Sequence, residues 1–149
     1  SVNVYEHTPL RQHLTMVSQD PFVFADTIRN NIQGANEKSE KDIWDILDLV
    51  ALKEEVESFP DRLETPLGEW GLNLSGGQKQ RLTMARAFIQ KPSFLFLDDC
   101  LSSVDTLTEE KILKNMTSYL ENKTVIWVSH RKSTLRLCDR ILEINHAAT

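Results

Sequence analysis

The chain has 149 residues, 40% of them hydrophobic, which is enough for one domain with a hydrophobic core. Its net charge of −5 and the absence of a dense run of Lys and Arg argue against a nucleic-acid-binding surface. The two cysteines, Cys100 and Cys138, show no CxxC or other metal-ligand spacing, which argues against a zinc site. They fit a reducing cytosolic compartment, with both as small apolar residues.

Short apolar segments and helical patterns follow one another from the N-terminus. Residues 14–18 (LTMVS) predict a strand that ends before Pro21. Ser39 is expected to cap a helix whose apolar residues recur at helical spacing as far as Val50. A shorter helix is expected over residues 52–59, because Pro60 stops it.

The second half of the chain continues this alternation. Residues 65–73 predict a loop, and Ser75 opens a helix that runs to about residue 90. Residues 94–97 (FLFL) are continuously apolar, which is typical of a parallel strand covered on both faces. Asp105 is expected to cap the next helix, which presents one apolar face. A strand, a short helix and a last strand are expected at residues 124–128, 133–137 and 140–144.

Strands that alternate with helices predict an α/β fold with a parallel sheet. The mostly helical residues 21–90 are expected to form a subdomain inserted between residues 1–20 and 91–149, which supply the sheet.

Polar side chains stand where three of the expected strands end. Gln19 follows the first strand, Asp98 and Asp99 follow FLFL, and Ser129 and His130 follow the strand at residues 124–128. Ligands of open α/β sheets bind at the carboxyl ends of the strands, so these side chains are candidates for one site. Each of them alone is common in ordinary loops, and only their order, together with the segment at Ser75, points to a function.

Ser75 and Gln78 form a capping-box pattern around Gly76 and Gly77. The unpaired N–H groups and the dipole of a helix N-terminus favour an anion, and glycines let a phosphate approach the backbone closely. A helix start alone explains Ser75 and Gln78 but gives no reason for two glycines in the first turn.

These segments resemble, in order and in sequence, the motifs of ATP-binding-cassette (ABC) ATPases. The segment LSGGQKQRLTMARA (residues 74–87) resembles the signature motif of that family. The other four motifs are the Q-loop VSQDPFVF around Gln19, the Walker B strand FLFLDD, the D-loop SSVD (Ser102 to Asp105) and the switch segment VSH ending at His130. The resemblance covers essentially the whole chain and implies a P-loop NTPase core of the RecA-like kind with an inserted helical subdomain.

The resemblance also implies roles for residues and for ATP and Mg²⁺ as cofactors. Asp98 would help to hold the Mg²⁺ of the nucleotide, and Gln19 would contact that ion or the attacking water. Asp99 stands where the family usually has glutamate, the residue that orients and polarises the water. A side chain one methylene shorter places its carboxylate roughly 1–1.5 Å farther back, which can lower a rate on the order of a hundredfold. His130 would contact the γ-phosphate.

The family works as a head-to-tail sandwich, and the resemblance implies a second nucleotide-binding domain as partner. Ser75, Gly76, Gly77 and Gln78 would contact ATP held by that partner, with Ser103 and Asp105 of the D-loop at the interface. No glycine in the chain begins a G-x-x-x-x-G-K-[ST] phosphate loop, or Walker A motif, which lies upstream of the Q-loop in this family. We therefore expect the chain to lack its first strands and Walker A helix, and to be inactive alone.

Two further segments indicate the exporter branch of the family. Residues 24–32 (FADTIRNNI) and residues 65–74, just before the signature, resemble exporter segments that lie near the coupling helices of the membrane domain. The aspartate at position 99 is similar to the degenerate half of heterodimeric exporters.

The sequence therefore predicts the ATP-hydrolysing part of an ABC transporter that drives export, at the cytoplasmic face of the cell's inner or plasma membrane. The apolar stretches of this chain are far shorter than the roughly 20 residues that span a bilayer, so this part is expected to be soluble. Two alternatives stay open: a soluble ABC ATPase without a transport role, and a module that presents the signature without nucleotide affinity of its own.

Overall fold

A three-stranded parallel sheet forms one layer of the molecule. The structure, a computed structural model, describes residues 13–68 and 72–144. The strands β1 (Leu14–Val17), β2 (Phe94–Asp98) and β3 (Thr124–Val128) lie in the order β1-β2-β3. Val17 pairs with Leu97, and Leu97 with Trp127, both in parallel register. The expected α/β fold with a parallel sheet is confirmed.

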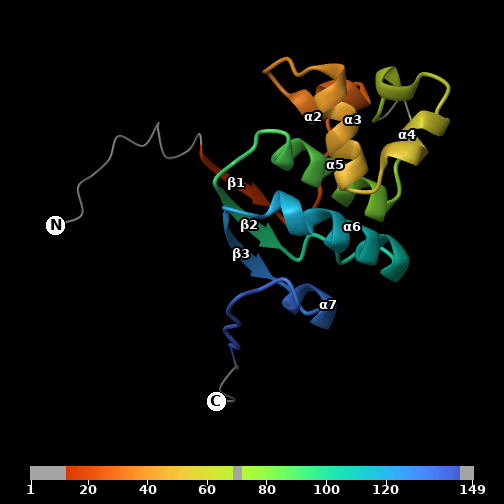
Figure 1. The fold of residues 1–149 in the computed structure, drawn as a ribbon. Coiled ribbons are helices and arrows are strands. Elements are labelled where there is room, and N and C mark those ends of the chain that lie inside the picture. The colour runs from red at the N-terminus through yellow and green to blue at the C-terminus, as the bar shows by residue number, and fades with distance from the viewer. Residues whose placement is uncertain (1–12, 69–71, 145–149) are drawn as a thin grey trace.

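The segment between β1 and β2 is mostly helical. It contains α2 (Ile28–Gln33), α3 (Glu40–Leu49), α4 (Lys53–Ser58), a 3₁₀ turn (Arg62–Glu64) and α5 (Gly76–Phe88). Figure 1 shows α2, α3 and α4 gathered on one side, with α5 between them and the strands. The expected cap of α3 is present, since the Ser39 hydroxyl accepts a hydrogen bond from the N–H of Asp42. Helix α2 was not expected, and it begins where Thr27 caps the N–H of Asn30.

Two helices follow the later strands. Helix α6 (Thr106–Tyr119) begins at Asp105, whose carboxylate accepts the N–H of Thr108 at 3.0 Å as expected. The Tyr119 hydroxyl donates to the carbonyl of Phe88 at 2.7 Å and so ties the end of α6 to the end of α5. Helix α7 (Lys132–Leu135) follows β3. None of the helices in the described ranges is both long and apolar enough to cross a bilayer.

One hydrophobic core joins the sheet to the helices. Leu82 and Phe88 of α5, Leu97 of β2 and Met116 of α6 are all almost fully buried in the same cluster. A buried side chain of this size stabilises a fold by roughly 1.5–3 kcal/mol. The predicted boundaries at residues 20/21 and 90/91 fall between the elements, but the core runs across both of them.

Among residues 13–68 and 72–144, no helix or strand covers the opposite face of the sheet. Its apolar side chains are exposed by 39–59%: Leu14, Met16, Phe94, Ile126 and Val128. The residues that alternate with them in β1 and β2, such as Val17 and Leu95, are buried. The expectation that FLFL is covered on both faces is therefore wrong, because the helices of the described residues cover only one face. We call this surface the bare face.

The expected last strand, residues 140–144, is also wrong. This segment has no strand structure, and Ile141, Leu142 and Ile144 are 62–86% exposed. This short apolar segment has no neighbouring strand in the part of the chain that the structure describes.

Candidate functional site

The three strands end at one edge of the sheet, where the sequence places its candidate residues. Gln19 lies just after β1, Asp98 ends β2 and Asp99 follows it, and His130 lies just after β3. Because the strands are parallel and adjacent, these segments meet at the same edge. Gln19 and His130 are exposed, whereas Asp98 and Asp99 are half-buried. The edge thus offers two carboxylates, an amide and an imidazole to a ligand.

Asp99 makes the sharp turn that leaves β2. Its φ of 41° lies in the left-handed region, which Asp tolerates better than most residues. The Asp99 N–H donates to the carbonyl of Val128 at 2.9 Å, and its carbonyl accepts the N–H of Ser102 at 3.1 Å. The turn therefore binds the end of β2 to β3 and starts the D-loop, Ser102 to Asp105.

The donor set at this edge suits Mg²⁺ better than a metal held by protein alone. Among residues 13–68 and 72–144, no three His, Cys, Asp or Glu side chains gather as a metal site. Mg²⁺ in nucleotide sites uses one or two carboxylates and takes its other ligands from phosphate and water. Asp98 and the amide oxygen of Gln19 are hard oxygen donors of that kind.

The start of α5 forms the expected capping box. The Ser75 hydroxyl accepts the N–H of Gln78 at 3.2 Å, and the Gln78 side chain accepts the N–H of Ser75 at 2.8 Å. Gly76 and Gly77 occupy the first turn, where N–H groups have no partner within the helix. Ser75 and Gly76 are exposed. This end of α5 can accept an anion from outside the chain.

The structure supplies a reason for the second glycine that the sequence did not reveal. A Cβ added at Gly77 would lie 2.8 Å from the carbonyl oxygen of Ser103. A Cβ at Gly76 would lie 3.4 Å from the Ser103 Cβ, a tight but possible contact. Gly77 thus lets the D-loop pack against the first turn of α5, so the pair of glycines is no evidence by itself for a phosphate.

Gln80, which the sequence reading did not single out, joins three of the candidate segments. Its side-chain amide donates to the Ser102 hydroxyl at 2.8 Å and to the carbonyl of Gln19 at 3.4 Å. Its side-chain oxygen accepts the N–H of Ser103 at 2.8 Å. A signal was available, because Gln80 precedes Met84 by one helical turn and Phe88 by two, on the buried face. A polar residue at a core position of a helix needs a partner.

Glu55 of α4 steadies the same helix start. It accepts hydrogen bonds from Gln78 and from Arg81, both at 2.6 Å. Arg81 is 6% exposed and also donates to the carbonyl of Ala51. The charge of Arg81 is therefore neutralised next to the capping box. Nothing in the sequence pattern linked Glu55 to the signature segment.

The last turn of α5 holds the exporter-like segment. Arg86 donates to the carbonyl oxygens of Phe22 and Asn31, at 2.9 and 2.6 Å, and lies over the ring of Phe24 at 4.7 Å. Burial lowers the pKa of Arg86 from its ordinary value. Phe22 and Phe24 are 63% and 51% exposed, with their rings 5.0 Å apart.

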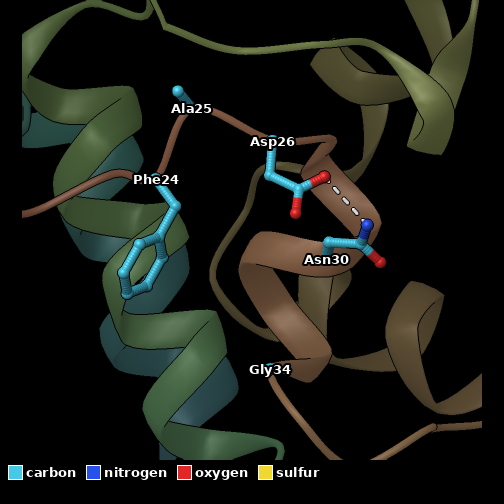
Figure 2. A pocket seen from close by; sticks show the side chains of 5 residues that line it. All are labelled: Phe24, Ala25, Asp26, Asn30 and Gly34. Atoms are coloured by element: carbon cyan, nitrogen blue, oxygen red, sulfur yellow. Dashed lines mark hydrogen bonds between the residues drawn. The ribbon is translucent and has the colours of Figure 1, made fainter.

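Phe24 also lines an open hollow of about 580 Å³ with Ala25, Asp26, Asn30 and Gly34. Figure 2 shows Phe24 lying against a helix on one side, and Asp26 joined to Asn30 on the other. Most of this hollow is lined by the exporter-like residues 24–32, and none of its lining residues is a candidate residue of the sheet edge.

The structure does not bring all candidate residues together. Gly77 meets Ser103 of the D-loop, and Gln80 joins the D-loop to Gln19. Among the described residues, no hydrogen bond links Ser75 to Asp98, Asp99 or His130. The helix start and the sheet edge are two separate parts of the surface, connected through the D-loop.

Comparison with known proteins gives the same family as the motifs. Residues 1–102 match the family described as ABC transporter. The chain is 43% identical over 138 residues to the uncharacterized ABC transporter ATP-binding protein YwjA of Bacillus subtilis, covering 92% of the chain and 24% of that protein. It is 39% identical over 133 residues to the multidrug resistance ABC transporter ATP-binding and permease protein of Lactococcus lactis subsp. lactis, covering 88% and 22%.

A solved structure gives the same family assignment. The chain superposes with a TM-score of 0.79 and 36% identity on a bacterial Atm1-family ABC exporter with ATP bound, covering 86% of this chain and 23% of that one. The chain therefore spans about a quarter of the length of these relatives. By sequence, motif order and fold, this chain belongs to the ABC transporter ATP-binding family.

Proposed function

We propose that the chain is the ATP-binding part of an ABC exporter, in which ATP hydrolysis drives transport across a membrane. The observation that carries the proposal is the sheet edge with Gln19, Asp98, Asp99 and His130, joined through the D-loop to the signature helix. The relatives' names, which include multidrug resistance and export, favour this over a soluble ATPase without a transport role.

Within the site, each candidate residue has a role that its position allows. Asp98 and Gln19 would hold Mg²⁺, which neutralises charge on the phosphates of bound ATP. Asp99 would accept a proton from the attacking water, and His130 would donate to a phosphate oxygen. Their places at strand ends, on backbone that the sheet fixes, preorganise them for this work.

The signature would serve a second nucleotide-binding domain. The N–H groups of Gly76 and Gly77 and the Ser75 hydroxyl would face the partner's nucleotide, while the N–H groups of Ser75 and Gln78 are held within the capping box. Ser103 and Asp105 of the D-loop are also exposed. Because the 149 residues contain no phosphate loop, we propose that the loop comes from elsewhere in the protein and that this chain alone binds ATP poorly.

Calorimetric titration of Mg-ATP into the 149-residue chain tests this point. We expect no detectable heat. Binding at micromolar affinity that a Ser75→Arg variant abolishes would contradict it, since these motifs would then form a nucleotide site without the loop. In the full-length protein, Ser75→Arg should reduce ATP hydrolysis, because the arginine blocks the helix start that faces the partner.

The aromatic segment at Phe22 and Phe24 would meet the membrane domain at the cytoplasmic face. It exposes two rings that Arg86 holds in place, next to the hollow in Figure 2. Phe24→Ser in the full-length protein should lower transport more than it lowers ATP hydrolysis. Equal losses of both would contradict a coupling role.

Asp99 leads us to propose that the chain is the weaker half of a heterodimeric exporter. If its carboxylate stands too far from the water, Asp99→Glu should raise the hydrolysis at its own site by roughly ten- to a hundredfold. Asp99→Asn should then change little in the heterodimer. Brisk hydrolysis by a homodimer of the full-length protein, abolished by Asp99→Asn, would overturn this proposal.

A further inference from the structure

The D-loop turn is held from two sides by side chains that lie outside it. Within the turn, the N–H of Val104 donates to the carbonyl of Leu101 at 3.0 Å. Gln80 of α5 binds the turn on the side of Gln19, through Ser102 and Ser103. On the other side stands Arg131, the residue after His130.

Arg131 reaches the D-loop backbone at two points. One terminal nitrogen of its guanidinium donates to the carbonyls of Ser102 and Val104, at 2.9 and 3.2 Å. The other terminal nitrogen donates to the carboxylate of Glu109 on α6. A planar guanidinium with all these partners has a single orientation, so it fixes the turn relative to both α6 and the segment after β3.

Glu109 is buried to an unusual degree for a carboxylate. Its side chain is 2% exposed, whereas that of Arg131 is 30% exposed. A buried carboxylate must be neutralised and hydrogen-bonded, and Arg131 together with the Ser133 hydroxyl supplies both. The ion pair anchors the guanidinium, while the hydrogen bonds to the D-loop carbonyls are additional to it.

The backbone next to His130 is fixed as well. The N–H of Arg131 donates to the Ser129 hydroxyl at 3.0 Å, and that hydroxyl donates to Thr134 at 3.3 Å. His130 lies between these two anchored residues. The Arg131 side chain thus links the backbone next to His130 to the D-loop.

We propose that Arg131 is a positioning residue that makes the D-loop turn and His130 move as one unit, with Glu109 as its buried counter-charge. This inference rests on the proposed function, because it gives His130 and the D-loop their roles in ATP hydrolysis. It predicts that phosphate contact at His130 is transmitted to Ser103 and Asp105 at the partner interface.

Hydrogen exchange and ATPase kinetics of the full-length protein test the proposal together. In Arg131→Met, the amides of residues 102–104 should exchange at least tenfold faster. The kcat for ATP should fall about tenfold while KM stays within twofold. Arg136→Met, at an exposed arginine that follows α7, is the matched control and should change none of these values.

A double variant separates positioning from simple charge neutralisation. Arg131→Met with Glu109→Gln removes the buried unpaired carboxylate and should recover thermal stability, but not the slow exchange of the D-loop or the kcat. If the double variant recovers both, Arg131 is only a counter-ion and the proposal is wrong. A wild-type protein without ATPase activity would refute the proposed function, and faster D-loop exchange in Arg131→Met would still support the positioning.

Discussion

The two cysteine side chains differ in their exposure to solvent. Cys100, directly after the acidic pair, is fully buried, and burial raises its pKa to about 12, with smaller contributions from Asp99 and Asp98. Cys138 is partly exposed after α7, where its sulfur donates to the carbonyl of Thr134. Only the second thiol is open to reagents in the folded chain.

We expect a disulfide reagent such as DTNB at about pH 8 to modify one thiol per folded chain, because the thiolate is the reacting form. The rapid reaction should disappear in Cys138→Ser and remain in Cys100→Ser. Cys100 should react only after unfolding in denaturant. Rapid modification of Cys100 in the native chain would contradict its burial.

Asp105 gives the start of α6 a dependence on pH. The backbone N–H of Thr108, followed by the Thr108 side chain, lowers the pKa of Asp105 below its ordinary value. The ionised Asp105 cap therefore stabilises the folded chain fully above about pH 4, the ordinary pKa of Asp. This stabilisation is lost as the pH falls through the lower pKa of Asp105 in the folded chain.

Replacing Asp105 with Asn keeps an acceptor for the cap but removes the titration. We expect the urea midpoint of Asp105→Asn to fall less steeply than that of the wild type below about pH 4. Asp139→Asn, at an exposed aspartate outside the helix caps, should follow the wild-type curve. Identical acid slopes in all three proteins would contradict a role for this cap.

At the scale of elements, α5 connects the two candidate surfaces. Its first turn packs on the D-loop through Gly77, and its last turn holds Phe22 through Arg86. The helix is about 20 Å long at 1.5 Å per residue, so its two ends reach regions far apart on the molecule. Its first turn is fixed by close backbone packing together with the capping box, and its last turn by the hydrogen bonds of Arg86.

The two glycines of α5 should respond differently to the same change. Gly77→Ala places a Cβ against the Ser103 carbonyl and should lower the free energy of unfolding by about 1–3 kcal/mol, because backbone must move. Gly76→Ala should be neutral or stabilising by up to about 1 kcal/mol, since alanine favours helix and the contact is tolerable. Urea unfolding of both variants measures this, and an equal response would argue against close packing at Gly77.

Local signals in the sequence predicted most helices and strands. The sequence did not predict contacts between residues that are far apart along the chain. The caps at Ser39, Ser75 and Asp105 depend on residues three positions apart, so the sequence alone predicts them. The strand at residues 140–144 was predicted from its apolar pattern alone, and a pattern cannot show whether a neighbouring strand exists. The contact of Gly77 with Ser103 joins positions 26 residues apart and was not visible either.

The same limit holds for the candidate site. Adjacent parallel strands bring Gln19, Asp98 and His130 to one edge, so strand ends and family motifs were enough to predict that placement. Gln80, Glu55 and Arg131 were missed because their partners lie 22 to 61 residues away. These three residues are polar, but the sequence does not show that the structure buries or half-buries their side chains, where a polar group needs a partner.

For the whole molecule, the bare face is the feature with the largest effect on behaviour. Parallel sheets normally have both faces covered, and exposed apolar patches promote association. Met16 and Ile126 are 59% and 52% exposed on this face. We expect the 149-residue chain to bind the dye ANS and to associate as its concentration rises.

Lysine substitutions on the two faces of the sheet should show whether the bare face is exposed to water in the folded chain. Met16→Lys and Ile126→Lys should reduce ANS binding and association without lowering the urea midpoint, because both sites already face water. Leu95→Lys, on the covered face with no exposure, should unfold the chain. Loss of stability in Met16→Lys or Ile126→Lys would show that the face is covered within this chain.

The bare face also has a consequence for the acidic site. Asp98 lies two residues after Phe96 and four after Phe94 in β2, and so it shares their side of the sheet. Any layer that covers these phenylalanines excludes water from around Asp98 and lowers the local dielectric constant. Coulomb attraction between the carboxylate and a cation grows as the dielectric constant falls. The covering of the sheet and the binding of a divalent ion are therefore thermodynamically linked, and each should strengthen the other.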